Sequence, residues 1–393
     1  MNPLRFYVPT RLVMEPGCVE SLGQMLSTQG VDSALVITDR GVMEAGCVSK
    51  ALASLDGAGI DHEIYHGVEQ NPTEENVREA HEAVSLNGFG AIVAVGGGSV
   101  IDTAKAVVAL IAECCEIRNL YSRDVVGKAP VTLVAIPTTA GTGSEMTRSS
   151  VITNKEARVK ETIRGECLYP KIALVDPELT VTLPKSITAS TGMDALTHAI
   201  EAYTTKSAHP MSDALAVEAA RLVFGNLRRA VDSGRDLQAR TCMSAASTLA
   251  GMAFSISGLG MVHAMAEPLG GRFNIPHGVA NSILLPHCLS FNCDAVLGKL
   301  AHLARTLDLS PLSGLSDREA IGEDAREVVE AVKRLSQDVG IPHRIDSLSV
   351  SKKEFEGLID DSLRNSCLNA NPKKVGRKDI TRIYAEVLEI RGS

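Results

Sequence analysis

Four side chains in the second half of the sequence are of types that bind a divalent metal ion: Asp194, His198, His263 and His277. Asp194 and His198 are four residues apart in a run of helical character, so both side chains lie on one helical face. One carboxylate and three imidazoles form a complete ligand set, which favours Fe²⁺ or Zn²⁺ because no thiolate is among them. As alternatives, an aspartate in a first turn complements the helix dipole, and a lone histidine is often an ordinary polar residue. The spacing predicts a metal site but does not prove that the four side chains meet.

A long uncharged stretch, Thr241–Val262, leads up to His263. It is long enough to span a bilayer, but it is rich in Ser, Thr and Gly. We therefore expect a buried helix of a helical domain that ends at His263, and no membrane segment. A histidine at the end of a buried helix needs a partner. His287 could be a group near the metal or a helix-start residue, and we interpret the other histidines as surface or structural: His62, His66, His81, His209, His302 and His343.

Two glycine-containing loops follow predicted strands in the first half. The strand Ala91–Val95 leads into Gly96–Ser99 and then into a helical pattern. This arrangement directs backbone N–H groups and the positive end of a helix at a phosphate. A second strand, Thr132–Ile136, leads into the polar run Pro137–Glu145, which suits ribose and phosphate contacts. A tight turn and a flexible loop are the alternatives, but two such loops favour nucleotide binding.

The choice between NAD and NADP depends on Asp39, which follows the predicted strand Ala34–Thr38. A carboxylate there can accept hydrogen bonds from the adenosine ribose and repel a 2′-phosphate, which favours NAD. Arg40 could instead accommodate that phosphate, so NADP stays open. Asp39 could also be a simple turn residue.

The elements that must position these residues differ between the two halves. In the first half, short β-branched runs alternate with amphipathic segments, which indicates a parallel sheet covered on both faces. After about Ser186 the pattern becomes helical. We predict an α/β Rossmann-like dinucleotide-binding domain at 1–185 and an all-α metal-binding and substrate domain at 186–393, with the chemistry in the cleft between them. The expected strands are Ala34–Thr38, His62–Tyr65, Ala91–Val95, Thr132–Ile136 and Ile172–Val175, and the expected helices include Glu74–Leu86 and Ser99–Ala112.

Composition excludes several classes. The chain has a formal net charge of -8, no tryptophan and 3% aromatic residues, which argues against nucleic-acid binding. Its nine cysteines are an odd number without CxxC spacing, so we expect neither a disulfide framework nor a thiolate zinc site, and a reducing cytoplasm fits best. The N-terminus has no signal-peptide pattern.

Taken together, the motifs resemble those of the iron-containing (group III) alcohol dehydrogenases. The resemblance extends from the first strand to Pro372, and the run around Asp194 and His198 is its most specific part. The matching motifs are Gly-Gly-Gly-Ser at 96–99, the run Pro137–Glu145, Asp176-Pro177, the run Gly192–Tyr203 and Pro276-His277-Gly278.

The resemblance implies a metal bound between the domains by the four residues named above, and at least a homodimer. It implies that Phe254 and Cys367 line the substrate pocket, although either could be core. Lys160 could equally be a solvated hairpin charge. The implied NAD(P) contacts, with Gly97 added from the glycine loop, are Asp39, Asn71, Gly97, Gly98, Ser99, Thr138, Thr139, Thr142, Val151, Lys160 and Leu179.

One position departs from the family pattern. Many members have a second histidine one turn after the ligand that matches His263, and Glu267 stands there in this chain. We hypothesise that Glu267, or a chain of ordered waters, takes over the proton transfer attributed to that histidine.

The predicted activity is the interconversion of a small alcohol and its aldehyde, with the metal as Lewis acid and the nicotinamide as hydride carrier. A reductase of an acidic aldehyde and a hydroxyacid-oxoacid transhydrogenase are alternatives, for which Arg148, Arg272 and Lys373 are the cations of interest. A dehydroquinate-synthase-like lyase would share the fold, but the Gly192–Tyr203 signature argues against it. A non-catalytic nucleotide-binding or metal-storage protein is a further alternative.

Overall fold

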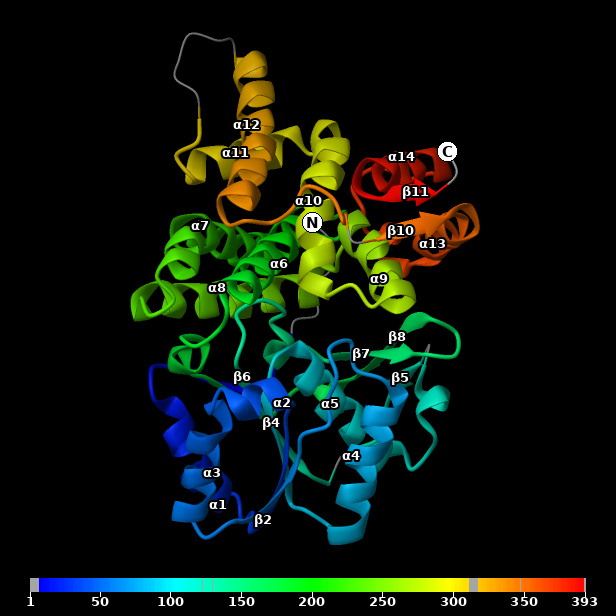
Figure 1. The fold of residues 1–393 in the computed structure, drawn as a ribbon. Helices are drawn as coiled ribbons and strands as arrows, with labels where there is room; N and C mark the ends of the chain where they lie inside the picture. Colours follow the sequence, from blue (N-terminus) through cyan, green and yellow to red (C-terminus); the bar gives the residue numbers. More distant parts are fainter. Residues whose placement is uncertain (1–6, 122, 129, 311–316, 347, 392–393) are drawn as a thin grey trace.

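The computed structural model describes residues 7–121, 123–128, 130–310, 317–346 and 348–391. An α/β part forms the lower half of Figure 1 and a helical part forms the upper half. The fold class predicted from the sequence is confirmed.

The α/β part is built on a six-stranded sheet in which every neighbouring pair is parallel, in the order β1-β9-β6-β4-β2-β3. Its strands are β1 (Arg11–Met14), β2 (Ser33–Ile37), β3 (Asp61–Tyr65), β4 (Ala91–Gly96), β6 (Thr132–Pro137) and β9 (Ile172–Val175). Gly96 pairs with Pro137 in the register of β4 and β6, so the two glycine-containing loops start side by side at one edge of the sheet. That edge is where open α/β sheets bind ligands.

Alternate residues of each central strand pack into different cores. In β4, Ile92 and Ala94 join the core under α4 (Glu74–Asn87) and α5 (Gly98–Glu113), whereas Val93 and Val95 join the core on the other face. That second face is covered by α1 (Leu22–Ser27) and α3 (Cys47–Gly57), and α2 (Arg40–Glu44) follows β2. Burial on both faces explains why these strands are continuous apolar runs.

The five predicted strands are confirmed within a residue or two, but four others in the first half were not predicted. β1 is a short edge strand in which no residue is fully buried. The other three, β5 (Asp124–Val125), β7 (Ser149–Asn154) and β8 (Val159–Gly165), form a small sheet in which β7 and β8 pair as an antiparallel hairpin. The hairpin contacts α9 (Met261–Phe273) of the helical part, so it links the two halves of the molecule.

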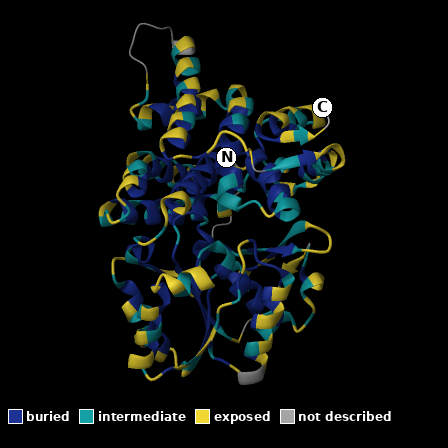
Figure 2. Cartoon of the chain, viewed as in Figure 1, coloured by how far each residue is buried: buried dark blue, intermediate teal, exposed yellow. Residues whose placement is uncertain are grey.

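The helical part contains nine α-helices in its described residues. A shared apolar core holds them together, and α6 (Lys185–Thr204) is buried along most of its length, as Figure 2 shows. The helices are α6 (Lys185–Thr204), α7 (Pro210–Asp232), α8 (Leu237–Ser257), α9 (Met261–Phe273), α10 (His277–Asn292), α11 (Leu297–Thr306), α12 (Asp317–Asp338), α13 (Lys352–Arg364) and α14 (Arg377–Val387).

One expectation for this part was wrong, and one small element was not predicted. The uncharged stretch Thr241–Val262 is not one helix, because the chain breaks at Gly258, whose φ of 75° is left-handed, and α8 and α9 meet at 105°. Within the described residues no single helix is long and apolar enough to cross a membrane, although this bent pair passes that test by length and composition. The part is also not wholly helical, since β10 (Ser349–Ser351) and β11 (Glu389–Arg391) form a small parallel sheet.

Candidate metal and cofactor site

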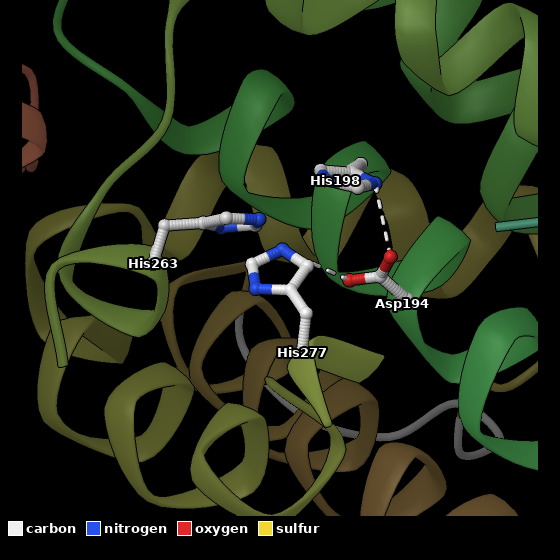
Figure 3. A group of neighbouring side chains, drawn as sticks. All are labelled: Asp194, His198, His263 and His277. Carbon is white, nitrogen blue, oxygen red and sulfur yellow. Dashed lines mark ion pairs between the residues drawn. The ribbon is translucent and has the colours of Figure 1, made fainter. Parts of the chain in front are cut away.

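Asp194, His198, His263 and His277 converge from three helices, as Figure 3 shows. One ligand atom from each can be chosen so that all lie within 4.8 Å of one another. Asp194 and His198 are on α6, His263 is the third residue of α9 and His277 is the first of α10. The first three are buried and His277 is partly exposed.

Two of the imidazoles are oriented by hydrogen bonds from Nδ1 to groups outside the four-residue cluster. His198 donates from Nδ1 to the carbonyl oxygen of Gly141 at 3.2 Å, and His263 donates from Nδ1 to the Glu201 carboxylate at 2.6 Å. A nitrogen that donates a proton cannot bind a cation, so Nε2 of each ring is the available ligand atom. The Phe254 ring lies against His198, with 4.6 Å between the ring centroids.

Burial is the largest influence on the protonation of this cluster. It lowers the pKa of His198 to about 4 and that of His277 well below 6.5. For Asp194 burial alone would raise the pKa, but the three imidazoles outweigh it and lower the pKa from 3.8. For His263 burial would lower the pKa, but the hydrogen bond to Glu201 raises it. An ionised Asp194 beside neutral His198 and His277 is the protonation state that metal ligands need.

These residues fit a divalent cation. The cluster offers one anionic oxygen and three imidazole nitrogens, from three buried side chains and the partly exposed His277, at mutual distances suited to one ion. Asp194 lies in the third turn of α6, which begins at Lys185, so the helix-dipole alternative does not apply to it. His287 pairs with Glu386 at 2.7 Å, which shows that it belongs to a different contact.

The cluster opens into a cavity of about 1240 Å³ between the two parts of the chain. Every predicted cofactor residue lines this cavity, as do Glu267, Phe254 and Cys367. The predicted cofactor residues along the wall are Asp39, Asn71, Gly97, Gly98, Ser99, Thr138, Thr139, Thr142, Val151, Lys160 and Leu179.

The two loops that follow β4 and β6 approach each other closely in the cavity wall. α5 begins at Gly98, and a Cβ on that residue would lie 2.6 Å from Thr142 Cγ2, so glycine is needed for the close approach of the two loops. The buried hydroxyl of Thr138 has no hydrogen-bond partner among the described residues. A buried orphan hydroxyl in a cavity wall indicates a missing polar ligand.

Three other cofactor positions have identifiable local roles. Asp39 caps α2 by accepting from Val42 N–H at 2.9 Å, which uses one of its two carboxylate oxygens. Asn71 has a φ of 57° and donates to Asn274 at 2.8 Å, so it ties the α/β part to the helical part. Lys160 is not a solvated hairpin charge, because burial lowers its pKa and its side chain lies beside Gly270 of α9.

Glu267 lies in the cavity wall one turn after His263, and Asn365 donates a hydrogen bond to its carboxylate. Of the three cations proposed for an acidic substrate, only Arg148 lines the cavity. Arg272 and Lys373 do not line it, and each is paired with an aspartate.

The sequence reasoning missed two polar residues that contact the cluster. Glu201 lies seven residues after Asp194 on the same helix, and Asn281 lies four residues after His277. Both spacings return to the same helical face, so the periodicity carried a signal for each. Gly141, whose backbone oxygen orients His198, carried no such signal.

The sequence matches two family models over most of its length. Residues 9–177 match the model for iron-containing alcohol dehydrogenase, and residues 188–388 match the C-terminal model of the Fe-containing alcohol dehydrogenase family. A 1,3-propanediol dehydrogenase from Klebsiella pneumoniae is 39% identical over 383 residues, 97% of this chain and 98% of that protein. An NAD-dependent methanol dehydrogenase from Bacillus methanolicus is 36% identical over 383 residues, 98% of this chain and 99% of that protein. The crystal structure of a 1,3-propanediol oxidoreductase has a TM-score of 0.92 at 38% identity and covers 98% of this chain and 99% of that one.

A nucleotide-binding sheet, a helical domain and a metal-ligand cluster in one cavity define a metal-dependent, nicotinamide-linked oxidoreductase. The chain belongs to the iron-containing alcohol dehydrogenase family, and it interconverts small alcohols and aldehydes. The lyase and the non-catalytic storage alternatives are therefore set aside.

Proposed function

We propose that the chain catalyses the reversible NAD-linked oxidation of a small alcohol, with a metal ion held by Asp194, His198, His263 and His277. The observation that carries this proposal is that these four donors line the same cavity as the glycine loop. A divalent cation held there supplies a Lewis acid that offsets charge on the substrate oxygen, and the nicotinamide supplies or accepts the hydride.

The residues of the chain bind and orient the reactants. The backbone N–H groups at the start of α5, from Gly98 and Ser99, bind the cofactor pyrophosphate. The hydroxyls of Thr138, Thr139 and Thr142 donate to the cofactor from the neighbouring loop. No covalent intermediate with the protein is needed, because hydride transfer requires only position and charge stabilisation.

The test of the metal site is His263→Ala, for which we expect loss of both bound metal and turnover. Protein purified without oxygen should contain about one divalent ion per chain by elemental analysis. The ligand set suits Fe²⁺ and Zn²⁺, and the family favours Fe²⁺. Full alcohol-dependent NADH production by the metal-free variant would refute the proposal.

The cofactor is proposed to be NAD because the Asp39 carboxylate lies in the cavity wall at the end of β2. Replacing Asp39 with Ala removes the repulsion of a 2′-phosphate, so the ratio of kcat/KM with NAD to kcat/KM with NADP should fall by about tenfold or more. An unchanged ratio would count against this role of Asp39.

Proton transfer is assigned to Glu267, directly or through water. Its place in the cavity wall, one turn from His263, supports this assignment. Glu267→Ala should alter the pH profile of kcat, whereas Glu267→Asp should restore it in part. An unchanged profile in the alanine variant would remove Glu267 from the mechanism.

A neutral substrate of a few carbons is favoured, in keeping with the names of the 1,3-propanediol and methanol dehydrogenases. The acidic-aldehyde and transhydrogenase alternatives retain one supporting cation, Arg148, which itself lies 3.4 Å from Asp124. Comparing kcat/KM for a short aldehyde with and without a terminal carboxylate decides between a neutral and an acidic substrate. A site built to bind a carboxylate rejects the neutral analogue.

We also propose the domain boundaries and the oligomeric state of the chain. A cofactor-binding domain spans 1–185 and a metal-binding and substrate domain spans 186–393. We also expect a homo-oligomer, at least a dimer, in the cytoplasm, which size-exclusion chromatography with light scattering and cell fractionation would test.

A further inference from the structure

Asn281 lies at the centre of the metal-ligand cluster. Its side chain is fully buried on α10, one turn after His277. The amide nitrogen is 2.6 Å from Asp194 Oδ1, 3.0 Å from His277 Nε2 and 3.1 Å from His263 Nε2. This one side chain therefore contacts a ligand from each of the three helices that build the cluster.

Glu201 supports the same cluster from the opposite side of His263. One of its oxygens accepts from His263 Nδ1 at 2.6 Å, and the other accepts from the backbone N–H of Val262 at 2.7 Å. A Cβ on Gly260 would lie 3.0 Å from this carboxylate, so the glycine lets the first turn of α9 approach it. Both oxygens of Glu201 are thus used to fix the position and ring orientation of one ligand.

We propose that Asn281 and Glu201 are positioning residues of the metal centre, which hold Asp194 and His263 in the orientation that a cation requires. This inference rests on the proposed metal-dependent function. A carboxylate has about four lone-pair sites, so Asp194 can accept from Asn281 and still present an oxygen to a cation. Glu201 keeps the proton of His263 on Nδ1, which leaves Nε2 free for the cation.

His277 lacks the kind of outer hydrogen bond that orients His198 and His263. Its Nδ1 is buried and has no hydrogen-bond partner among the described residues, so no outer group orients its ring from behind. Its Nε2 contacts Asn281 at 3.0 Å. The lone pair of a ring nitrogen can go either to the Asn281 amide or to a cation, so in the metal-bound chain Asn281 holds only Asp194. Loss of the Asn281 amide and loss of the Glu201 carboxylate should therefore each free one ligand.

The experiment measures metal affinity directly. The purified full chain is loaded with Zn²⁺ or Co²⁺, and the dissociation constant is determined by competition with a chromophoric chelator. Removing an outer hydrogen-bond partner of a metal ligand weakens metal binding by about 10–100-fold. We expect a loss in this range for Asn281→Ala and for Glu201→Ala, and a smaller loss for Glu201→Gln, since an amide oxygen still accepts from His263. The visible spectrum of the Co²⁺ protein should change in the alanine variants, because it reports ligand geometry.

Asn292→Ala is the matched control. Asn292 is a buried amide on the same helix, and it bonds to Asn371 at 2.9 Å rather than to the cluster. This variant should lower stability without changing metal affinity. Asn281→Leu serves as a second variant that fills the site if the alanine variant does not fold, and NADH binding checks that the cofactor half is intact.

The outcomes separate this inference from the proposed function. If the wild-type chain binds Zn²⁺ tightly and Asn281→Ala or Asn281→Leu binds it within about threefold of wild type, the inference is overturned and the metal site stands. An equal loss in Asn292→Ala would also overturn it, since the effect would then be a general loss of packing. If the wild type binds no metal, the proposed function itself fails.

Discussion

Lys105 gives a quantitative test of how the loop beside the cofactor cavity is held. This lysine of α5 is completely buried. Its ammonium group donates to the Ser144 carbonyl at 2.6 Å, to the Thr147 hydroxyl at 2.8 Å and to the Ser149 carbonyl at 3.0 Å. Residues 144–149 lead into β7 and supply part of the cavity wall, so one buried cation anchors this segment.

Burial disfavours the charged form of Lys105 and lowers its pKa from 10.5 to about 8, although Asp102 and Glu145 oppose the shift. The folded chain therefore releases this proton at a lower pH than the unfolded chain. Between the two pKa values the unfolded state holds more protons, so stability must rise with pH in that window. The linkage relation gives a gain of about 3 kcal/mol from this group between about pH 7 and pH 10.5.

Lys105→Met removes the titrating group and keeps a side chain of similar length. The free energies of unfolding of wild type and variant are measured by urea denaturation across that pH range. We expect the difference, wild type minus variant, to increase by about 1.4 kcal/mol per pH unit above about pH 8 and to be flat below it. A difference that stays constant, or that falls as the pH rises, would refute the assignment of Lys105 as a buried cation with a lowered pKa.

Two glycines give further predictions. Gly98→Ala brings a Cβ to 2.6 Å from Thr142, so the dissociation constant of NADH should rise by about tenfold, as measured by fluorescence titration. Gly225→Ala is its control, because a Cβ at Gly225 would have no neighbouring atom within 4 Å. NADH binding should not change in this variant. If NADH binding weakens equally in both variants, the close contact with Thr142 is not the cause. Gly251→Ala places a Cβ 2.6 Å from the backbone oxygen of Gly143, which cannot move as a side chain can. Gly251→Ala should lower the free energy of unfolding by about 1–3 kcal/mol. A variant as stable as wild type would show that the contact between α8 and the loop that contains Gly143 is not tight.

The sequence by itself determined the features that depend on local spacing. β-branched runs predicted five strands of the sheet, and the glycines after β4 predicted the turn into α5. Asp194 and His198 were predicted to share a helical face because residues four apart always do, and α6 bears this out. His263 and His277 were proposed from their residue types alone, because no periodicity connects them to that pair.

Only the tertiary structure decided which distant residues meet. The direction of His263 depends on the break at Gly258, which turns α9 by 105° from α8, and no short-range pattern encodes that angle. From the sequence, Lys160 could be either a cofactor contact or a solvated hairpin charge. The packing of the hairpin against α9 excludes the solvated charge. Contacts between segments tens of residues apart are set by how whole helices and strands pack, because side-chain spacing along the chain constrains directions only within a single element.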